Sequence, residues 1–286
     1  MGGAAGAGWR AAKTRGARGL SDIFAGQGTD EELLAELYDL EHDEITEDLA
    51  FYRELARRHR GPVIDLGCGS GRLFRAFVDG GTERIVGVDG APALLDRAEA
   101  RRAADPALEA VPVELVHGDV RTVRRSDRFA LAVLAGVIAH LEGPEDGVRA
   151  LDAARRLLRR DGVLVVDLLG PGALPAHDLP LSVDWHRQVG DRRIVRRSAL
   201  TRRETPEGLR VDYATLTDLV EADGTIARLP ASFRLWYPEP TALIGLAAEA
   251  GLVAEARYGS HDLDPLDEQS ERCIIVLRPG IDRGVE

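Results

Sequence analysis

Two different periods of apolar and polar residues divide the chain. From Gly61 to about Gly170, short apolar runs such as VIDL, RIVGVD and FALAVLA are separated by stretches whose apolar residues recur at helical spacing. Strands that alternate with amphipathic helices in this way are typical of a parallel sheet with helices on both faces. We therefore expect residues 61–180 to form an α/β core.

The segment before this core has a different composition. Residues 1–20 are rich in Gly, Ala and Arg without periodicity, which predicts a disordered tail. Residues 21–60 contain TDEELLAELYDLEHDEITEDLAFYRELARRH, where a Thr-Asp start followed by acids is an N-cap signature and apolar residues return at helical spacing. This pattern predicts two helices that form an N-terminal helical cap.

Beyond the core the apolar period shortens to two. Residues 181–237 carry turn signals at VGDRR, TPEG and EADGT, which predict an antiparallel β insertion of about four strands. Residues 238–286 begin with a helix that has Pro238 near its start and ends at Gly251. The runs VAEARY and RCIIVLRP then supply two final strands, which we expect to complete the sheet of the core.

Composition narrows the class of protein. The 286 residues are 44% hydrophobic and 30% charged, which is ordinary for a globular protein, and no apolar run is long enough to span a bilayer. The opening MGGAAGAGWR lacks the apolar core of a signal peptide, so we expect a cytoplasmic protein without a membrane partner. Cys68 and Cys273 are read as small buried residues, with neither a disulfide nor a metal site expected.

The charge balance bears on possible partners. A formal net charge of −11 argues against a nucleic-acid substrate, because tracking phosphates requires an excess of Lys and Arg on one face. The arginine-rich run at 192–203 alternates with apolar residues, which fits the solvent face of an antiparallel strand better than a phosphate site. A small-molecule partner is the remaining expectation.

The run VIDLGCGSGRL carries the most specific chemical signal. An apolar strand brings Asp65 to a turn that contains Gly67, Gly69 and Gly71, and an amphipathic stretch follows directly. Glycines allow positive φ and close approach of a ligand to the backbone. Asp89 ends the next apolar run, where a carboxylate can accept hydrogen bonds from both ribose hydroxyls of an adenosine. The run lacks the Lys-Ser/Thr pair of a P-loop, which disfavours triphosphate hydrolysis.

This arrangement resembles the class I S-adenosylmethionine (SAM) methyltransferases. The resemblance covers five segments in the order that the family uses: the glycine-turn motif at Asp65–Gly71, the ribose-binding Asp89, HGDV at His117–Val120, the fourth strand and its continuation at Phe129–Asp146, and LLRRDGVLVVDL at Leu157–Leu168. It implies a Rossmann-like, seven-stranded, mostly parallel sheet. SAM is then the cofactor and S-adenosylhomocysteine the product.

The resemblance also implies which residues bind the cofactor. Asp119 in HGDV corresponds to the acid that contacts the adenine amine, and a tyrosine of the N-terminal helix, here Tyr38, closes over SAM. The complete set implied to bind SAM is Tyr38, Asp65, Gly67, Gly69, Gly71, Arg72, Asp89, Gly90, Leu94, Asp119, Val120 and Ala135.

The antiparallel insertion indicates a branch of the family. A meander before the last helix and strands is similar to glycine N-methyltransferase and to the amino-sugar N,N-dimethyltransferases of antibiotic pathways. The chain has no asparagine, so the Asn-Pro-Pro-Tyr motif of adenine-N6 and glutamine-amide methyltransferases is absent. An insertion of this kind leaves strand edges and an apolar face to cover, as a lid or as a dimer element, and we expect a homodimer.

Methyl transfer from SAM is an in-line displacement, so the protein must position the acceptor, exclude water and take up a proton where needed. A neutral amine attacks unaided, whereas a hydroxyl requires a general base. His140 lies just past the fourth strand, at the ligand-binding edge of the sheet, and is the candidate base; the alternative is that it only shapes the pocket.

Two further residues are catalytic candidates. Tyr38 is able to contact the sulfonium or the acceptor, or else to pack within its helix, and His186 of the insertion is able to face the acceptor. Tyr213, Arg234 and Trp236 are weaker candidates, because aromatic residues of a meander mostly form its apolar face.

The sequence leaves the acceptor open. We favour an amine of a small, natural-product or sugar-like molecule, with a hydroxyl as the next choice. Two other classes remain as alternatives: a SAM-binding protein without transferase activity, and a nicotinamide-dependent oxidoreductase, since Asp89 suits the ribose of either cofactor.

Overall fold

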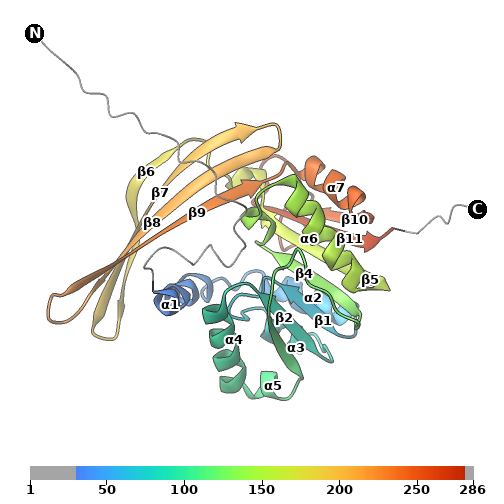
Figure 1. Ribbon diagram of the computed structural model, residues 1–286, viewed down its shortest axis with the longest axis horizontal. Coiled ribbons are helices and arrows are strands. Elements are labelled where there is room, and N and C mark those ends of the chain that lie inside the picture. The colour runs from blue at the N-terminus through green and yellow to red at the C-terminus, as the bar shows by residue number, and fades with distance from the viewer. Residues whose placement is uncertain (1–29, 281–286) are drawn as a thin grey trace, which may run out of the picture.

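Seven strands build the central sheet of the molecule (Figure 1). The computed structural model describes residues 30–280, so the expected tail at residues 1–20 lies outside the described residues. The strands are β1 (Val63–Leu66), β2 (Ile85–Asp89), β3 (Val113–His117), β4 (Phe129–Ala135), β5 (Leu158–Leu169), β10 (Leu252–Tyr258) and β11 (Arg272–Pro279). Their order is β10-β11-β5-β4-β1-β2-β3, and β11 alone runs antiparallel to its neighbours. The predicted Rossmann-like, seven-stranded, mostly parallel sheet is confirmed.

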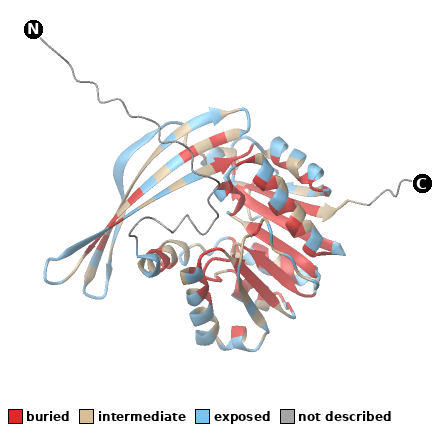
Figure 2. Ribbon diagram, viewed as in Figure 1, coloured by how far each residue is buried: buried red, intermediate tan, exposed pale blue. Residues whose placement is uncertain are grey.

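Helices cover both faces of this sheet. They are α1 (Glu31–His42), α2 (Leu49–Arg58), α3 (Phe74–Asp79), α4 (Pro92–Ala104), α5 (Pro106–Glu109), α6 (Pro144–Leu157) and α7 (Pro240–Glu249), with short 3₁₀ turns η2 (Ile138–His140) and η3 (Pro171–Ala173). Helices α2 to α5 pack on one face, and α6 and α7 pack on the other. Figure 2 shows β1, β4 and β5 buried along most of their length. No helix between residues 30 and 280 is long and apolar enough to cross a membrane.

Local sequence explains where the flanking helices begin and end. Asp30 caps α1, because its carboxylate accepts a 3.0 Å hydrogen bond from the amide of Leu33. Pro240 occupies the first turn of α7, where its missing N–H costs nothing, and Gly251 follows the helix with a φ of 78°. The predicted pair of N-terminal helices is present, as α1 and α2.

The insertion is a separate four-stranded antiparallel sheet. Its strands β6 (Leu179–Val189), β7 (Arg192–Thr205), β8 (Gly208–Val220) and β9 (Ile226–Tyr237) lie in sequence order and are joined by turns at the three predicted positions. The sheet arches over α1 in Figure 1. This places its inner face opposite the carboxyl ends of β1, β2, β4 and β5.

The inner face of the insertion is apolar at its two ends and polar in the middle. At one end Ile194, Leu219 and Leu229 pack against Leu34 and Leu37 of α1. At the other end the adjoining parts of β8 and β9 pack into the main core. Between these anchors Arg196, Thr215 and Thr217 sit side by side, because Arg196 pairs with Thr217 in the β7–β8 ladder. The centre of the insertion is therefore held in place by its ends.

Candidate active site

A cavity of about 780 Å³ lies between the sheet, α1 and the insertion. Its floor is the carboxyl edge of the parallel strands, where ligands of open α/β sheets bind. Ten of the residues expected from the sequence line it: Tyr38, Gly67, Gly69, Arg72, Asp89, Gly90, Leu94, Val120, Ala135 and His140. One cavity thus joins the expected cofactor residues to the expected base.

The glycine turn after β1 has the backbone that its sequence requires. Gly67, Gly69 and Gly71 have φ values of 82°, 55° and 75°, a region that other residues rarely adopt. A Cβ on Gly67 would lie 2.3 Å from Cγ2 of Val137, and one on Gly69 would lie 2.8 Å from Oη of Tyr38. The backbone of this turn therefore reaches the cavity only because Gly67 and Gly69 have no side chains.

Two carboxylates flank the turn and differ in their partners. Asp89 accepts hydrogen bonds from the amides of Gly69 at 2.8 Å and Ala91 at 2.9 Å, so it also holds the turn. Asp65 is only 2% exposed and has neither a hydrogen bond nor an ion pair within residues 30–280. Burial, reinforced by the nearby charge of Asp89, raises the pKa of Asp65 to about 7. A cationic ligand would satisfy this carboxylate.

Helix α1 closes the cavity from above the turn. The rings of Tyr38 and His42 stack with centroids 3.9 Å apart, and Nδ1 of His42 is 2.8 Å from the carbonyl oxygen of Tyr38. Arg72, which directly follows the glycine turn, forms a bidentate pair with Asp48 and donates to the carbonyl of Ile45. This pair fastens the loop between α1 and α2 to the turn.

His140 ends η2, just past β4, and its side chain is reached from the cavity. Desolvation by the surrounding walls, with a smaller contribution from His42, lowers the pKa of His140 to about 4, although the residue is exposed to the open cavity. The imidazole is therefore neutral at pH 7. It accepts a hydrogen bond readily, but it is a weaker base than an unperturbed histidine.

A buried carboxylate at the end of β5 was not anticipated from the sequence. Asp167 accepts hydrogen bonds from Oη of Tyr52 at 2.7 Å and Nε of Arg272 at 2.9 Å, and Nε2 of His261 lies 2.9 Å from it. These contacts lower the pKa of Asp167 despite its burial. The charged carboxylate can only accept, so His261 carries its proton on Nε2. The available signal was the pattern VVD, which repeats the strand-ending acids Asp65 and Asp89.

The insertion contributes the roof of the cavity. Arg196 forms an ion pair with Glu41 of α1 and donates a 3.0 Å hydrogen bond to Oη of Tyr213. Thr215 and Thr217 also line the cavity, and their hydroxyls have no hydrogen-bond partner among the described residues. They are free to bind a ligand.

Several expected residues lie elsewhere. His186 is exposed on the edge strand β6, and Arg234 is exposed on β9. Trp236 is buried and donates to the carbonyl of Glu207 at 2.8 Å. Asp119 is paired with Arg121 beside the cavity. A Cβ on Gly71 would meet the ring of Phe74, so this glycine serves the packing of the turn.

The cavity carries an excess of negative charge. Three arginines line it, and each is paired with a carboxylate: Arg72 with Asp48, Arg196 with Glu41, and Arg272 with Asp167. Four further lining carboxylates have no guanidinium partner in the described part of the chain: Glu47, Asp89, Asp262 and Glu271. SAM carries a sulfonium and an ammonium group, so this charge and the open glycine turn both fit it.

The fold, the glycine turn and Asp89 at the end of β2 define the class of the protein: it has the class I methyltransferase fold, with SAM as its cofactor. Residues 63–162 match a family described as a methyltransferase domain. This stretch, about a third of the chain, is therefore similar to methyltransferase domains.

Comparison with curated sequences gives matches over about a third of the chain. The tRNA U34 carboxymethyltransferase of Shewanella putrefaciens is 34% identical over 108 residues, which are 37% of this chain and 31% of that protein. The same enzyme of Shewanella sp. strain ANA-3 is 33% identical over 107 residues. The chain spans about a third of the length of the curated relatives it matches.

Solved structures share the fold over nearly the whole chain. The CcbJ methyltransferase from Streptomyces caelestis is 23% identical, with a TM-score of 0.68 over 86% of this chain and 96% of that one. DesVI from Streptomyces venezuelae is 18% identical, with a TM-score of 0.68 over 86% and 98%. The sugar N-methyltransferase KedS8 from Streptoalloteichus is 21% identical, with a TM-score of 0.64 over 97% and 100%. At these identities the likeness establishes the fold, including the insertion.

Proposed function

We propose that the protein transfers a methyl group from SAM to an amine of a small, hydroxylated, sugar-like molecule. The observation that carries this proposal is the surplus of carboxylates in the cavity. Glu47, Asp262 and Glu271 line the cavity and lack guanidinium partners within residues 30–280. They attract an ammonium group more strongly than a neutral hydroxyl.

The proposed reaction requires little chemical activation by residues of the chain. When bound, SAM supplies an already activated methyl group. The chain has to hold the acceptor nitrogen in line and keep water out. An acceptor that arrives as an ammonium ion loses its proton to water before the transfer, so that its lone pair is free to attack, and the methylated product leaves as an ammonium ion. Neutral His140 accepts a hydrogen bond from the acceptor N–H and so fixes the direction of its lone pair. Helix α1 and the insertion cover part of the cavity, and a bound acceptor would displace water from the rest.

The roof supports a hydroxylated acceptor. Thr215 and Thr217 present hydroxyls without partners in the described chain, and Tyr213 presents a phenol beside Arg196. Groups of this kind bind the hydroxyls of a sugar, which both donate and accept hydrogen bonds. The fold shared with KedS8, described as a sugar N-methyltransferase, supports the same reading.

The same geometry weighs against the other acceptors. A hydroxyl acceptor needs a base with a pKa near 7, and burial lowers the pKa of His140 well below that. An RNA acceptor would bring phosphates to a cavity in which carboxylates outnumber guanidinium groups.

The decisive experiment measures methyl transfer from SAM to amino sugars, each paired with an analogue that has a hydroxyl in place of the amine. We expect methylation of the amine member only, detected by mass spectrometry. Transfer to the hydroxyl analogue would refute the amine. Calorimetric binding of SAM without transfer to any acceptor would indicate a non-catalytic protein, and binding of NADH instead of SAM would indicate an oxidoreductase.

Variants test the two walls of the acceptor site separately. His140→Gln keeps a hydrogen-bond acceptor and should retain most of kcat, whereas His140→Ala should lower it by about tenfold. A loss of 10²–10⁴ in kcat for both variants would instead identify His140 as a general base. Thr217→Val should raise KM for the amino sugar. The control is Thr201→Val, which changes an exposed threonine on the neighbouring strand β7 and should leave KM unchanged.

We further propose that the protein is a homodimer joined through the insertion. β6 is an edge strand, and its alternate residues Leu179, Leu181 and Val183 are 43%, 52% and 58% exposed. Apolar side chains on an unpaired strand edge favour pairing with a second copy. The cytoplasmic location expected from the composition stays a prediction.

A further inference from the structure

Seven arginines surround a groove of about 480 Å³ at the amino ends of the parallel strands, whereas the SAM cavity lies at their carboxyl ends. They come from the loop before β4, the end of α6 and the start of β5, with Pro279 and Gly280 at the end of β11 completing the wall. The arginines are Arg124, Arg125, Arg128, Arg155, Arg156, Arg159 and Arg160. None of the twelve lining residues is acidic, although the chain as a whole has a net charge of −11.

Neighbouring acids neutralise only part of this groove. Arg125 is paired with Glu114 and Asp127. Arg155 and Arg156 share a single carboxylate, that of Asp152.

The other four arginines have no carboxylate partner within the described chain. Arg128 donates only to three backbone carbonyl oxygens, at 3.0 to 3.1 Å. Arg124, Arg159 and Arg160 have neither an ion pair nor a hydrogen bond among residues 30–280.

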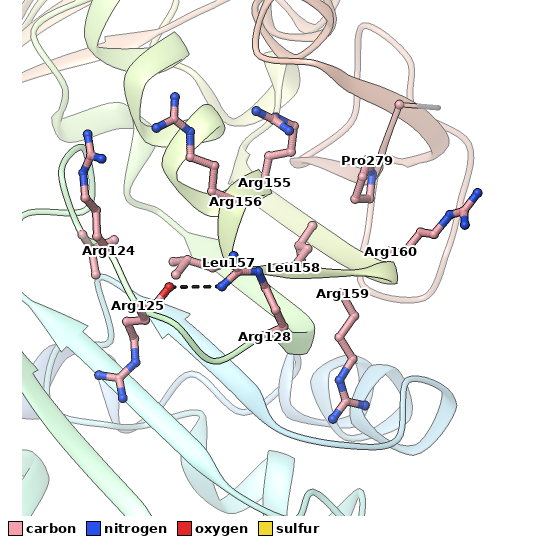
Figure 3. Close-up of a pocket in the computed structure, with 12 residues that line it drawn as sticks. Arg124, Arg125, Arg128, Arg155, Arg156, Leu157, Leu158, Arg159, Arg160 and Pro279 are labelled. Atoms are coloured by element: carbon pink, nitrogen blue, oxygen red, sulfur yellow. Dashed lines mark hydrogen bonds between the residues drawn. The ribbon is translucent and has the colours of Figure 1, made fainter. Parts of the chain in front are cut away.

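The directions of the side chains define the shape of that acceptor. Figure 3 shows Arg124, Arg155 and Arg156 extending to one side of the groove, Arg125 and Arg159 to the opposite side and Arg160 toward its far end, with Leu157 and Leu158 between them. Guanidinium groups spread in this way suit several linked anionic groups better than one central anion. The volume of the groove, about 480 Å³, limits such a ligand to a few linked groups.

We propose that this groove binds a compact phosphate chain, either free polyphosphate of a few units or the polyphosphate of a nucleotide. Two or three linked phosphates present oxygens on several sides, and arginines bind them through paired N–H donors. The strands place the groove at their amino ends and the SAM cavity at their carboxyl ends, so the two ligands bind without competing.

The experiment titrates the full chain by calorimetry in low salt with inorganic tripolyphosphate, with ATP and with a single-stranded RNA oligonucleotide. We expect binding of tripolyphosphate that weakens as salt is raised. Equal affinity for ATP and tripolyphosphate would assign recognition to the phosphates alone, and tighter binding of ATP would assign it to a nucleotide; both outcomes support the site. Failure to bind tripolyphosphate, or binding of RNA alone, would overturn it.

A matched pair of variants separates this groove from general charge effects. Arg124→Gln/Arg160→Gln removes two exposed arginines of the groove, and Arg53→Gln/Arg257→Gln removes two exposed arginines elsewhere. The first should weaken tripolyphosphate binding at least ~10-fold and the second less than about twofold. Equal losses would reject a defined site. SAM affinity should be the same in both variants and unaffected by saturating tripolyphosphate, which also verifies that each variant is folded.

Discussion

The phenol of Tyr52 on α2 donates a 2.7 Å hydrogen bond to Oδ2 of Asp167 at the end of β5. Both side chains are almost fully buried, and they are 115 residues apart in the chain. Arg272 of β11 and His261 of the preceding loop bind the same carboxylate. Asp167 therefore ties the N-terminal cap and the last strand to the middle of the sheet, directly beneath the cavity.

Replacing Asp167 should destabilise the protein strongly. Asp167→Asn removes the charge that Arg272 and His261 face, and loss of one partner of a buried ion pair costs about 3–5 kcal/mol in free energy of unfolding. Urea denaturation of the ligand-free chain at pH 7 measures the loss. Asp96→Asn, an exposed change on α4 without an ion pair in the described chain, should be neutral.

The difference in unfolding free energy between wild type and Asp167→Asn should depend on pH in a defined direction. Because the pKa of Asp167 is lowered by folding, its stabilisation is present above the ordinary value of 3.8 and is lost as the pH falls through the folded value. A difference between wild type and Asp167→Asn that is unchanged well below pH 3.8 would contradict the ion-pair assignment.

Two glycine variants separate the cost of backbone strain at positive φ from the cost of a steric clash. Gly67→Ala should suffer from positive φ and from the contact with Val137, whereas Gly81→Ala has a similar φ of 86° and nothing within 4 Å of its Cβ. We expect about 1 kcal/mol lost for Gly81→Ala and at least about 2 kcal/mol more for Gly67→Ala. Adding Val137→Ala should restore part of the second loss. Equal losses for the two single variants would show that Val137 yields freely.

Asp65 should make the ligand-free protein less stable as the pH rises. Folding raises its pKa from 3.8 to about 7, so its contribution to stability is greatest below 3.8 and declines as the pH rises through about 7. Asp65→Asn should therefore be more stable than wild type at pH 8, by at least about 1 kcal/mol. At pH 8 SAM should raise the melting temperature of wild type more than that of the variant. An Asp65→Asn protein with unaltered SAM affinity would remove the carboxylate from the cofactor site.

The proposed dimer is tested by light scattering after size exclusion. Wild type at micromolar concentration should have twice the mass of the chain. Leu181→Asp/Val183→Asp should reduce it to one mass, because two charges would enter the paired edge. Val253→Asp, which changes an equally exposed residue at 59% on β10, serves as control and should remain dimeric. A monomeric wild type would leave the insertion as a lid alone.

Periodicity predicted the fold well because the layers of this protein are strongly patterned. Val63 and Ile64 are consecutive residues in opposite apolar clusters, which is what a strand buried on both faces requires. The turns of the insertion were found because Gly190 and Gly224 adopt positive φ, a demand that is visible in sequence.

Only part of the candidate site could be predicted from the sequence. Glycines and strand-ending acids are local signals, and they indicated Asp65, Asp89 and the turn between them. The partners of Asp167 come from α2, β11 and the loop after β10, and no local pattern links residues that meet only after folding. His186 illustrates the same limit, because its placement on the exposed edge strand depends on which strand of the meander lies outermost.

The division of the insertion into apolar ends and a polar centre separates the proposed acceptor site from the cofactor site along the chain. Arg196, Thr215 and Thr217 belong to one continuous stretch of chain that enters after β5 and leaves before α7, while the glycine turn, Asp65 and Asp89 all precede it. Under the proposed function, substitutions at the centre would change which acceptor is methylated and would leave the apolar ends and the cofactor site in place. New acceptors would then arise by change in this single segment of the chain.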